Sequence, residues 1–365
     1  MEGILTHLRK IDWLLVLATV LLVSFGLLSI YSSSLGKGDF SNFKKQIIFF
    51  GIGMLLMFSI SFMDWRAIRE SSYFMVILYV FCLISLIGLF FFAPEIRGTK
   101  SWYKLGPVSI DPIEFMKLIL IVILAKYFSA RHVEMYRINH ILLSGFYVFL
   151  PSLLVFFQPN IGSVLILISI WLGTLIISGI KIRHFLILIL CGLILFAFSW
   201  QALLKDYQKA RILSFVQPQA ADNLTIGWNQ RQAKIAVGSG GILGQGIGKG
   251  SQTQYGFLPE TQTDFIFASI AEETGLVGIT ILFFLFVFLF WRIIKIALRN
   301  DTNFPRLFAS GLIIVLISEI FINIGMNIGL LPIIGIPLPL VSYGGSGLIT
   351  LFIGFGILQS IKINS

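Results

Sequence analysis

The apolar positions along this chain gather into long runs that contain few or no charged residues. A helix needs about 20 apolar residues to cross the hydrocarbon core of a bilayer. Ten runs are long enough to qualify, and they lie at residues 12–32, 46–63, 71–93, 113–130, 140–157, 161–180, 184–204, 264–291, 307–331 and 342–361. The pattern predicts an all-α integral membrane protein with about ten transmembrane helices in one polytopic domain, residues 1–365.

Two of the boundaries between these runs rest on proline rather than on charge. The stretch 138–180 carries no acid, Lys or Arg and would be about 65 Å long as one helix. Gln158-Pro159-Asn160 is where it should fold back, because Pro lacks an amide donor and stops a helix. The stretch 320–361 is divided in the same way by prolines at 332, 337 and 339.

Composition supports the membrane interpretation. The chain is 57% hydrophobic and 12% charged, whereas soluble domains carry about 25% charged residues. The first run is uncharged from Trp13 to Gly36, which is too long for a signal-peptide core of about 7–15 residues, so we expect it to be retained. The net charge of +10 favours anionic lipid or a lipid-linked anionic substrate over nucleic acid, since no soluble basic domain is evident.

The charges of the short loops give the spans a direction. With the N-terminus in the cytoplasm, the inner segments hold Arg9, Lys10, Arg66, Arg69, Arg131, Arg137, Lys181, Arg183, Arg292, Lys295, Arg299, Arg306 and Lys362. The short outer segments hold fewer cations, namely Lys37, Lys44, Lys45, Arg97, Lys100 and Lys104. The positive-inside rule therefore predicts an N-in, C-in protein. A large extracytoplasmic loop, 205–263, then lies between the seventh and eighth spans, and 94–112 is also outer.

Asp264 stands where the large outer loop meets an apolar helix. One interpretation is helix capping, because Thr261 and Asp264 have the spacing of a capping box. The other is a general base at the outer membrane boundary, where partial burial could tune its pKa.

Glu114 and Lys117 are three residues apart near the outer end of the fourth span, so they share one side of a helix. They either neutralise each other within the span or line a polar cavity. The acids at 272, 273 and 319 also lie in spans, and we expect them to face protein interior or water rather than lipid.

The loop 205–263 carries several cations and a glycine-rich stretch, 238–250. The cations Lys205, Lys209, Arg211, Arg231, Lys234 and Lys249 form either a solvated basic face or a pyrophosphate clamp. The glycines form either a compact surface loop or a backbone that a bulky ligand can approach closely. They do not form a P-loop, since Lys249 is followed by Gly250 rather than Ser or Thr.

Several segments together resemble one family, the SEDS proteins of shape, elongation, division and sporulation. They are FLPETQTDFIFA at 257–268 with AEE at 271–273, PLPLVSYGGS at 337–346, Trp102 with Leu105-Gly106, Pro112 and EFMK at 114–117, and Gln158-Pro159 with Gly162. GIPLP at 335–339 and Thr253-Gln254 resemble its RodA, or elongation, branch. The resemblance extends from the first span to the last.

The resemblance implies a peptidoglycan glycosyltransferase that polymerises lipid II on the outer face of a bacterial cytoplasmic membrane, for elongation and rod shape. It places the essential aspartate at Asp264, and Glu114 and Lys117 in its polar cavity. Arg211 matches its basic loop position. Trp102, Lys249 and Ser342 are further candidates for binding substrate or supporting the site. The implied partners are a class B penicillin-binding protein, which supplies the transpeptidase, and other elongation-complex membrane proteins.

Some positions depart from the family pattern. Asn160 stands where the family usually has Asp, and Ser101 replaces a frequent Arg. Asp111 and Ile113 replace the common Gln and Ser before Glu114. These departures weaken any expectation that the positions bind metal or phosphate here, and none of them involves Asp264.

Our hypothesis is an inverting glycosyl transfer with Asp264 as the base. A lipid II flippase and a non-catalytic scaffold for a penicillin-binding protein are the alternatives. No metal-ligand spacing is present, although Asp264, Glu114 and Glu260 could hold a divalent cation such as Mg²⁺ or Mn²⁺ near a pyrophosphate.

Overall fold

The structure of the protein is a computed structural model that describes residues 2–95, 99–106, 108–131, 138–202, 204, 206–216, 226–300 and 302–364. The helices are α1 Glu2–Lys10, α2 Trp13–Lys37, α3 Ser41–Ser61, α4 Trp65–Glu70, α5 Ser72–Phe92, α6 Pro112–Arg131, α7 Ile138–Phe157, α8 Ile161–Ile177, α9 Ile182–Ala202, α10 Asp206–Val216, α11 Ile226–Ser239, α12 Ser251–Gln254, α13 Ile266–Leu298, α14 Asn303–Ile328 and α15 Gly345–Ile363. A short antiparallel hairpin, β1 Tyr103–Leu105 and β2 Val108–Ile110, precedes α6.

Each of the ten predicted apolar runs coincides with a helix. Within the described residues, eight helices are long and apolar enough to cross a membrane: α2, α3, α5, α7, α9, α13, α14 and α15. The other two are α6, which carries Glu114 and Lys117, and α8, which has 17 residues. The prediction of an all-α multi-pass membrane protein is confirmed, and the count of ten stays a prediction.

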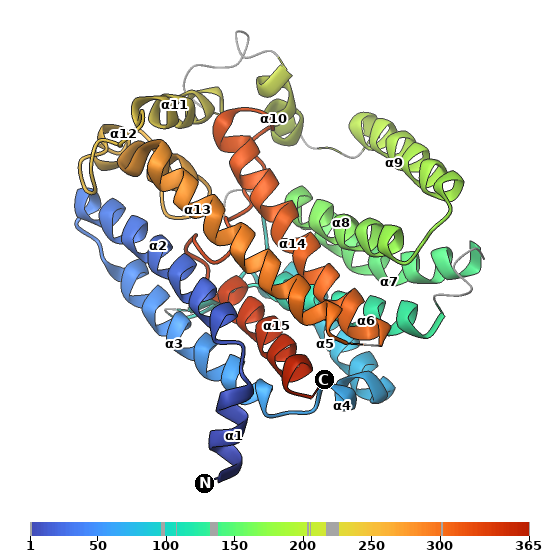
Figure 1. Ribbon diagram of the computed structural model, residues 1–365. Helices are drawn as coiled ribbons and strands as arrows, with labels where there is room; N and C mark the ends of the chain where they lie inside the picture. The colour runs from blue at the N-terminus through green and yellow to red at the C-terminus, as the bar shows by residue number, and fades with distance from the viewer. Residues whose placement is uncertain are drawn as a thin grey trace.

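Contacts between the turns divide the bundle into two ends (Figure 1). At one end the amide of Tyr343 donates to the carbonyl of Gln262, and the amide of Asp111 donates to Ser346 Oγ. At the other end the amide of Trp65 donates to Ser360 Oγ, and both chain termini lie there (Figure 1). These contacts agree with the predicted alternation of outer and inner turns. Which end faces the cytoplasm remains a prediction from the loop charges.

The helices pack closely where one of them offers a small residue, which is the usual device of membrane helices. Helix α2 lies against α13 and α3 against α15. A Cβ at Gly26 of α2 would collide with the carbonyl oxygen of Val341, and one at Gly53 of α3 would press on the Phe352 ring. Gly53 therefore sets how closely α3 approaches α15, and Gly26 lets α2 approach the backbone of the segment just before α15.

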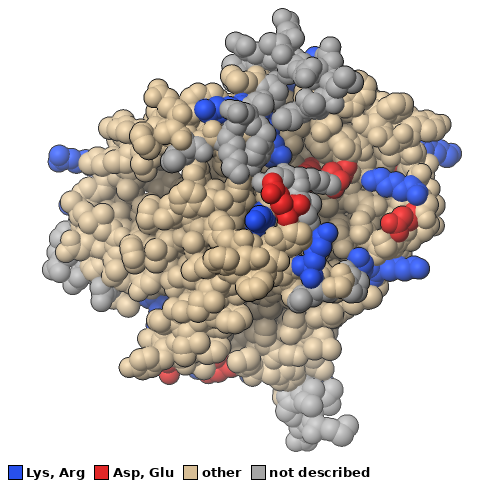
Figure 2. All heavy atoms as spheres, turned by 180° about the vertical axis from the view of Figure 1, so that it is seen from behind, with Lys and Arg blue, Asp and Glu red and all other residues tan. Residues whose placement is uncertain are grey.

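Helix α9 stands apart from the bundle (Figure 1), and none of its residues is buried. Large apolar side chains such as Leu186 and Phe198 are exposed along it. Figure 2 shows a broad surface without charged side chains on the rear face, with charged side chains gathered mainly above it. The exposed apolar side chains of α9 belong in lipid rather than in water.

The predicted outer loop 205–263 contains three helices that the apolar runs did not reveal, α10, α11 and α12. Helix α1 was also not predicted. These helices are too polar or too short to produce a span signal, because their stability comes from packing rather than from insertion into lipid.

A buried ion cluster closes the end that holds the termini. Asp12 accepts hydrogen bonds from the Arg292 guanidinium, and its carboxylate lies 3.6 Å from Lys362 Nζ. The side chain of Gln359 also bonds to the Asp12 backbone. Its Oε1 accepts from the Asp12 N–H at 2.8 Å, and its Nε2 donates to the Asp12 carbonyl at 3.2 Å. The cluster fastens the start of α2 to α13 and α15.

We predict that Asp12→Ala lowers stability by about 3–5 kcal/mol, because it leaves a buried guanidinium without its counter-ion. The control is Glu70→Ala, which removes an exposed pair with Arg69, 3.7 Å apart, and should cost at most about 1 kcal/mol. Thermal unfolding in detergent measures both. Equal melting temperatures for the two variants would contradict the role of the cluster.

Candidate functional site

Asp264 lies half-buried in the turn that leads into α13. The carbonyls of three successive residues in this turn are held from other segments. Gln262 O accepts from the Tyr343 N–H at 2.8 Å, and Thr263 O accepts from Ser342 Oγ at 2.9 Å. Asp264 O accepts from the side-chain amides of Asn323 and Asn327 on α14. The turn is therefore fixed in place although it is not helical.

The capping-box interpretation of Thr261 and Asp264 is wrong. Helix α13 starts at Ile266, and its N-cap is Phe265, which makes no side-chain capping hydrogen bond. The buried hydroxyl of Thr261 has no hydrogen-bond partner. Asp264 thus precedes the cap position, so capping does not account for its carboxylate.

Backbone strain is found in both segments that meet at this turn. Glu260 and Leu340 are non-glycine residues with φ angles of 46° and 65°. Such conformations cost roughly 1–3 kcal/mol each and cluster at functional sites. A Cβ placed on Gly335, whose φ is 82°, would lie 3.5 Å from Asp264 Oδ2. The carboxyl group of Asp264 therefore adjoins the loop that carries Leu340.

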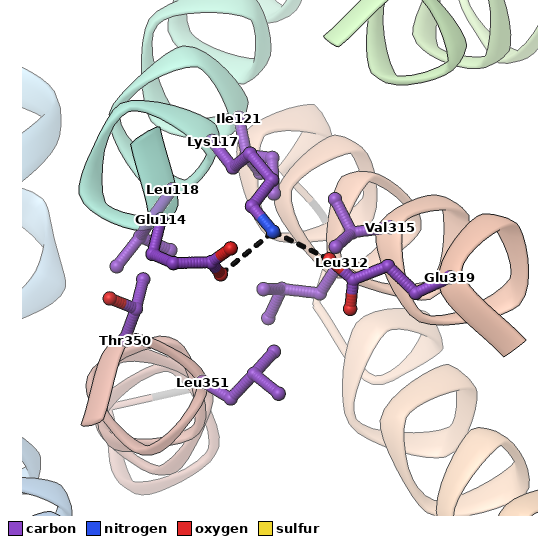
Figure 3. Close-up of a pocket in the computed structure, with 9 residues that line it drawn as sticks. All are labelled: Glu114, Lys117, Leu118, Ile121, Leu312, Val315, Glu319, Thr350 and Leu351. Atoms are coloured by element: carbon purple, nitrogen blue, oxygen red, sulfur yellow. Dashed lines mark hydrogen bonds and ion pairs between the residues drawn. The ribbon is translucent and has the colours of Figure 1, made fainter. Parts of the chain in front are cut away.

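A cavity lies beneath the start of α15 and is lined by α6, α14 and α15 (Figure 3). The empty space there is about 280 Å³ when the open solvent at its mouth is counted, and the enclosed part is only large enough for water. Lys117 Nζ lies 2.7 Å from Glu114 Oε2 and 2.5 Å from Glu319 Oε1, so one ammonium joins two carboxylates (Figure 3). The hydroxyl of Thr350 lines the same cavity and is buried without a hydrogen-bond partner.

Lys117 and Glu114 form the ion pair that the first interpretation expects, and they also line a cavity whose other walls are mostly aliphatic, so a polar substrate cavity stays a prediction. The role of Glu319 was not predicted beyond an inward orientation. A signal existed in the sequence, because an acid within an apolar run needs a partner and cations within the runs are few. The spacing of 202 residues between Lys117 and Glu319 left that partner unidentified.

Asp111 adds a further acid next to this cavity, just before α6. Its Oδ1 accepts from the Ile113 N–H at 3.2 Å. Desolvation, together with the neighbouring charge of Glu114, raises the pKa of Asp111 to about 8. The carboxyl group therefore holds its proton at neutral pH and can act as a hydrogen-bond donor there.

The remaining predicted site residues occupy different settings. Ser342 is buried and also accepts from the Leu338 N–H at 2.8 Å, so it supports the Asp264 turn. Trp102 is half-buried just before β1, Arg211 is half-buried in α10, and Lys249 is exposed. Among the described residues, no three or more His, Cys, Asp or Glu side chains are arranged to hold a metal ion.

Part of the glycine-rich stretch 238–250 packs against α13, through Gly240, Gly244 and Gly250, while Lys249 and several apolar side chains of the stretch stay exposed. Helix α13 is interrupted at Gly275, where φ is 64° and ψ is −162°. The Glu272 and Glu273 carbonyls near the break accept from the amides of Gln245 and Gly246 at 2.9 and 3.0 Å. A Cβ at Gly244 would collide with the Glu273 carbonyl oxygen.

The side chains of the two acids bond to this stretch and to the segments beside it, and Glu273 Oε1 accepts from the Gly248 N–H at 3.3 Å. Glu272 accepts from the amides of Gln252 and Thr253 at 2.7 and 3.0 Å, and Glu273 accepts from Ser32 Oγ at 2.6 Å. Both acids are buried, which confirms that they face protein interior. The compact-loop interpretation is therefore the better one, with the close approach made by the protein's own backbone.

Two of the departures from the family pattern contact each other. Asn160 Nδ2 lies 3.3 Å from Ser101 Oγ, while Asn160 Oδ1 caps α8 by accepting from the Ser163 N–H. An uncharged hydrogen bond thus stands where the family pattern would place Asp beside Arg. The contact joins the turn before α8 to the segment before β1 without burying charged groups.

Comparison with known proteins gives consistent matches along the whole chain. The FTSW_RODA_SPOVE family model, described as "Cell cycle protein", matches residues 10–365. Peptidoglycan glycosyltransferase MrdB of Escherichia coli (strain K12) is 36% identical over 351 residues, which cover 96% of this chain and 93% of that protein. Stage V sporulation protein E of Bacillus subtilis (strain 168) is 36% identical over 363 residues, covering 96% of each.

Solved structures agree with the sequence matches. A chain from a study titled "Structural coordination of polymerization and crosslinking by a peptidoglycan synthase complex" superposes with a TM-score of 0.81 at 28% identity, over 97% of this chain and 98% of that one. The crystal structure of Thermus thermophilus rod shape determining protein RodA superposes with a TM-score of 0.72 at 26% identity, over 96% of each chain.

We predict that Lys117→Met destabilises the protein by about 3–5 kcal/mol, because two carboxylates lose their shared cation. The double variant Lys117→Met/Glu319→Gln should recover part of the loss, since it removes one uncompensated charge. Thermal unfolding of the single, double and Glu319→Gln proteins completes a double-mutant cycle. Strictly additive effects would contradict the direct pairing.

We predict a pH-dependent stability difference between the wild type and Asp111→Asn. A carboxyl group whose pKa is raised by folding stabilises the protein below its unfolded pKa, and this stabilisation is lost as pH rises toward the folded pKa of about 8. The melting temperature of the wild type should therefore fall relative to Asp111→Asn between pH 4 and about 8. A difference that is constant over this range would refute the raised pKa.

Proposed function

This chain belongs to the FtsW, RodA and SpoVE family of cell cycle proteins, and from that premise we propose that it is a peptidoglycan glycosyltransferase of the RodA branch. It polymerises lipid II into β-1,4-linked glycan strands on the outer face of the cytoplasmic membrane. The relatives named for this activity match nearly its full length, which supports the assignment.

The reaction is a single inverting displacement. The 4-hydroxyl oxygen of the acceptor sugar attacks the anomeric carbon of the donor, and the bond from that carbon to the lipid pyrophosphate breaks. The hydroxyl proton passes to Asp264, and the lipid pyrophosphate leaves with the electron pair. Inversion requires one base and no covalent sugar–enzyme intermediate.

Asp264 is the general base in this proposal. Its carboxyl group is half-buried, and its backbone is held by α14 and by Ser342 through the preceding residue. A base must be held within hydrogen-bonding reach of the proton that it removes, and a clamped turn meets that requirement. The charge of the loops predicts an outer location for Asp264, which is where the glycan strand grows.

The other site residues stabilise charge and position the reactants. Arg211 and Lys249, on the predicted outer loop, bind the pyrophosphate as negative charge develops on it. Glu114 and Lys117 form a fixed set of charges with Glu319 in the adjacent cavity and orient polar groups of the substrate. Trp102 lies in the other outer segment and contacts the sugar or the peptide stem.

A class B penicillin-binding protein is the partner that would cross-link the strands. One of the solved structures that superposes on this chain comes from a peptidoglycan synthase complex, which supports such an assembly. Other membrane proteins of an elongation complex complete it. The location is the cytoplasmic membrane of a bacterium.

We predict that Asp264→Asn reduces polymerisation of lipid II by at least about 10²-fold, because general-base catalysis contributes about 10²–10⁴-fold. The assay uses purified protein in detergent with lipid II as the sole substrate and detects glycan chains on a gel. Binding of the penicillin-binding protein partner and the melting temperature serve as folding controls and should not change.

The same assay separates the alternatives. Glycan chains formed without a bilayer exclude a flippase as the whole explanation, since nothing is available to cross. A folded Asp264→Asn protein that binds its partner but makes no polymer excludes a scaffold. Full polymerisation by Asp264→Asn would remove Asp264 as the base.

A further inference from the structure

Helix α14 carries three buried polar side chains at intervals of four residues. Glu319, Asn323 and Asn327 are 5%, 0% and 0% exposed. Residues four apart share one face of a helix, so the three side chains form a polar ladder on α14. Polar groups in an apolar helix need partners within the protein. The partner of Glu319 is Lys117, whereas the two asparagines face the Asp264 turn.

The two asparagines hold the carbonyl of Asp264 together. Asn323 Nδ2 lies 3.1 Å from Asp264 O, and Asn327 Nδ2 lies 3.0 Å from the same oxygen. Asn323 Nδ2 also donates to the carbonyl of Ile336 at 2.8 Å. Ile336 is next to Gly335, which adjoins the carboxyl group of Asp264. The ladder therefore holds both the Asp264 backbone and the loop against which its carboxylate lies.

Asn327 also replaces a hydrogen bond of the helix. In a regular helix the Ala268 N–H would donate to Asp264 O, four residues earlier. Here the Ala268 N–H donates to Asn327 Oδ1 at 3.2 Å, and Asn327 Nδ2 donates to Asp264 O. The side-chain amide is thus inserted into the bond that would otherwise extend α13 back to Asp264. This insertion keeps Asp264 outside the helix.

We propose that Asn323 and Asn327 are positioning residues for Asp264, with the inserted amide of Asn327 holding the base outside α13 and Asn323 fixing it against the loop at Gly335. The inference rests on the proposed function, in which Asp264 removes the acceptor proton. Four residues of α14, a rise of about 6 Å, separate Asn323 from Glu319. The ladder therefore fixes the distance along α14 between the Asp264 turn, which the asparagines hold, and the ion pair of Lys117 with Glu319.

The test compares Asn327→Ala and Asn323→Ala with wild type in the lipid II polymerisation assay. A displaced base should lower kcat by about 10–100-fold, because a misplacement of about 1 Å can cost that much. KM should change by less than about 3-fold, since the substrate contacts remain. The acid limb of the kcat profile against pH should shift, because the surroundings of the Asp264 carboxyl change.

Asn327→Ser is the conservative variant, because one hydroxyl can both accept from Ala268 and donate to Asp264. It should recover part of the kcat lost in Asn327→Ala. The matched control is Gln359→Ala, which removes a buried amide that bonds the backbone of Asp12 at the opposite end. It should lower the melting temperature while leaving kcat within about 2-fold and the pH profile unchanged.

Hydrogen exchange of the Ala268 amide tests the contact with the Asn327 side chain independently of enzyme activity. The Ala268 amide should exchange at least about 10-fold faster in Asn327→Ala than in wild type, and at the wild-type rate in Gln359→Ala. Should Asn323→Ala fail to fold, Asn327→Ala and Asn327→Ser carry the test, because they leave the Asn323 contact with Ile336 intact.

The outcomes separate this inference from the proposed function. An active wild type, an inactive Asp264→Asn and asparagine variants that behave like Gln359→Ala would overturn the positioning role and leave the function standing. A wild type that makes no polymer would overturn the function, and the positioning role with it. Unchanged exchange at Ala268 together with an unchanged kcat in Asn327→Ala would overturn the inserted amide, because an α13 that extended back to Asp264 would protect Ala268 but displace the base.

Discussion

A backbone carbonyl that enters an apolar medium must find a donor within the protein, because lipid offers none. The turn before α13 presents three such carbonyls in succession, at residues 262–264. Their donors are the Tyr343 amide, the Ser342 hydroxyl and the amides of two asparagines on α14. The need to satisfy these groups fixes the loop before α15 and the end of α14 around a single acid. The backbone of Asp264 is held by other segments because the turn is not helical, so its carbonyls need donors from outside the turn.

The same constraint explains the glycine-rich stretch. The break at Gly275 frees the carbonyls and amides of the residues around it, and the stretch supplies partners for them. Only a backbone without side chains can come this close, which accounts for Gly240 and Gly244 facing the carbonyls of Ala271 and Glu273. The buried Glu273 side chain also accepts from the Gly248 amide, and the Glu272 side chain holds the start of α12 that follows the stretch. The stretch is therefore part of the scaffold that supports the predicted outer loop. Exposed residues on it, such as Lys249, are attached to a backbone that α13 holds in place.

The charges within the bundle show how a polar site can be kept inside an apolar protein. One ammonium, that of Lys117, serves two carboxylates that come from different helices. The uncharged contact between Asn160 and Ser101 shows the complementary solution, in which a pair of charges is replaced by a pair of polar groups. Buried charges are costly unless paired, so the charges of Glu114, Lys117 and Glu319 at the cavity are held in one arrangement by their ion pairs. Such fixed charges are what a glycosyl transfer with a pyrophosphate leaving group requires.

The sequence by itself determined the helices that face lipid, because insertion depends on the apolar length of each segment and on little else. Prolines placed the breaks at 158–160 and after 331, and the spacing of Glu114 and Lys117 placed them on one side of a helix. The apolar runs did not predict helices α10 to α12, because packing against the protein, not insertion into lipid, stabilises them. Only the tertiary structure decided that Glu319 pairs with Lys117 and that Asn323 and Asn327 hold Asp264. The sequence shows that a buried polar group needs a partner, but long-range packing selects which one it meets.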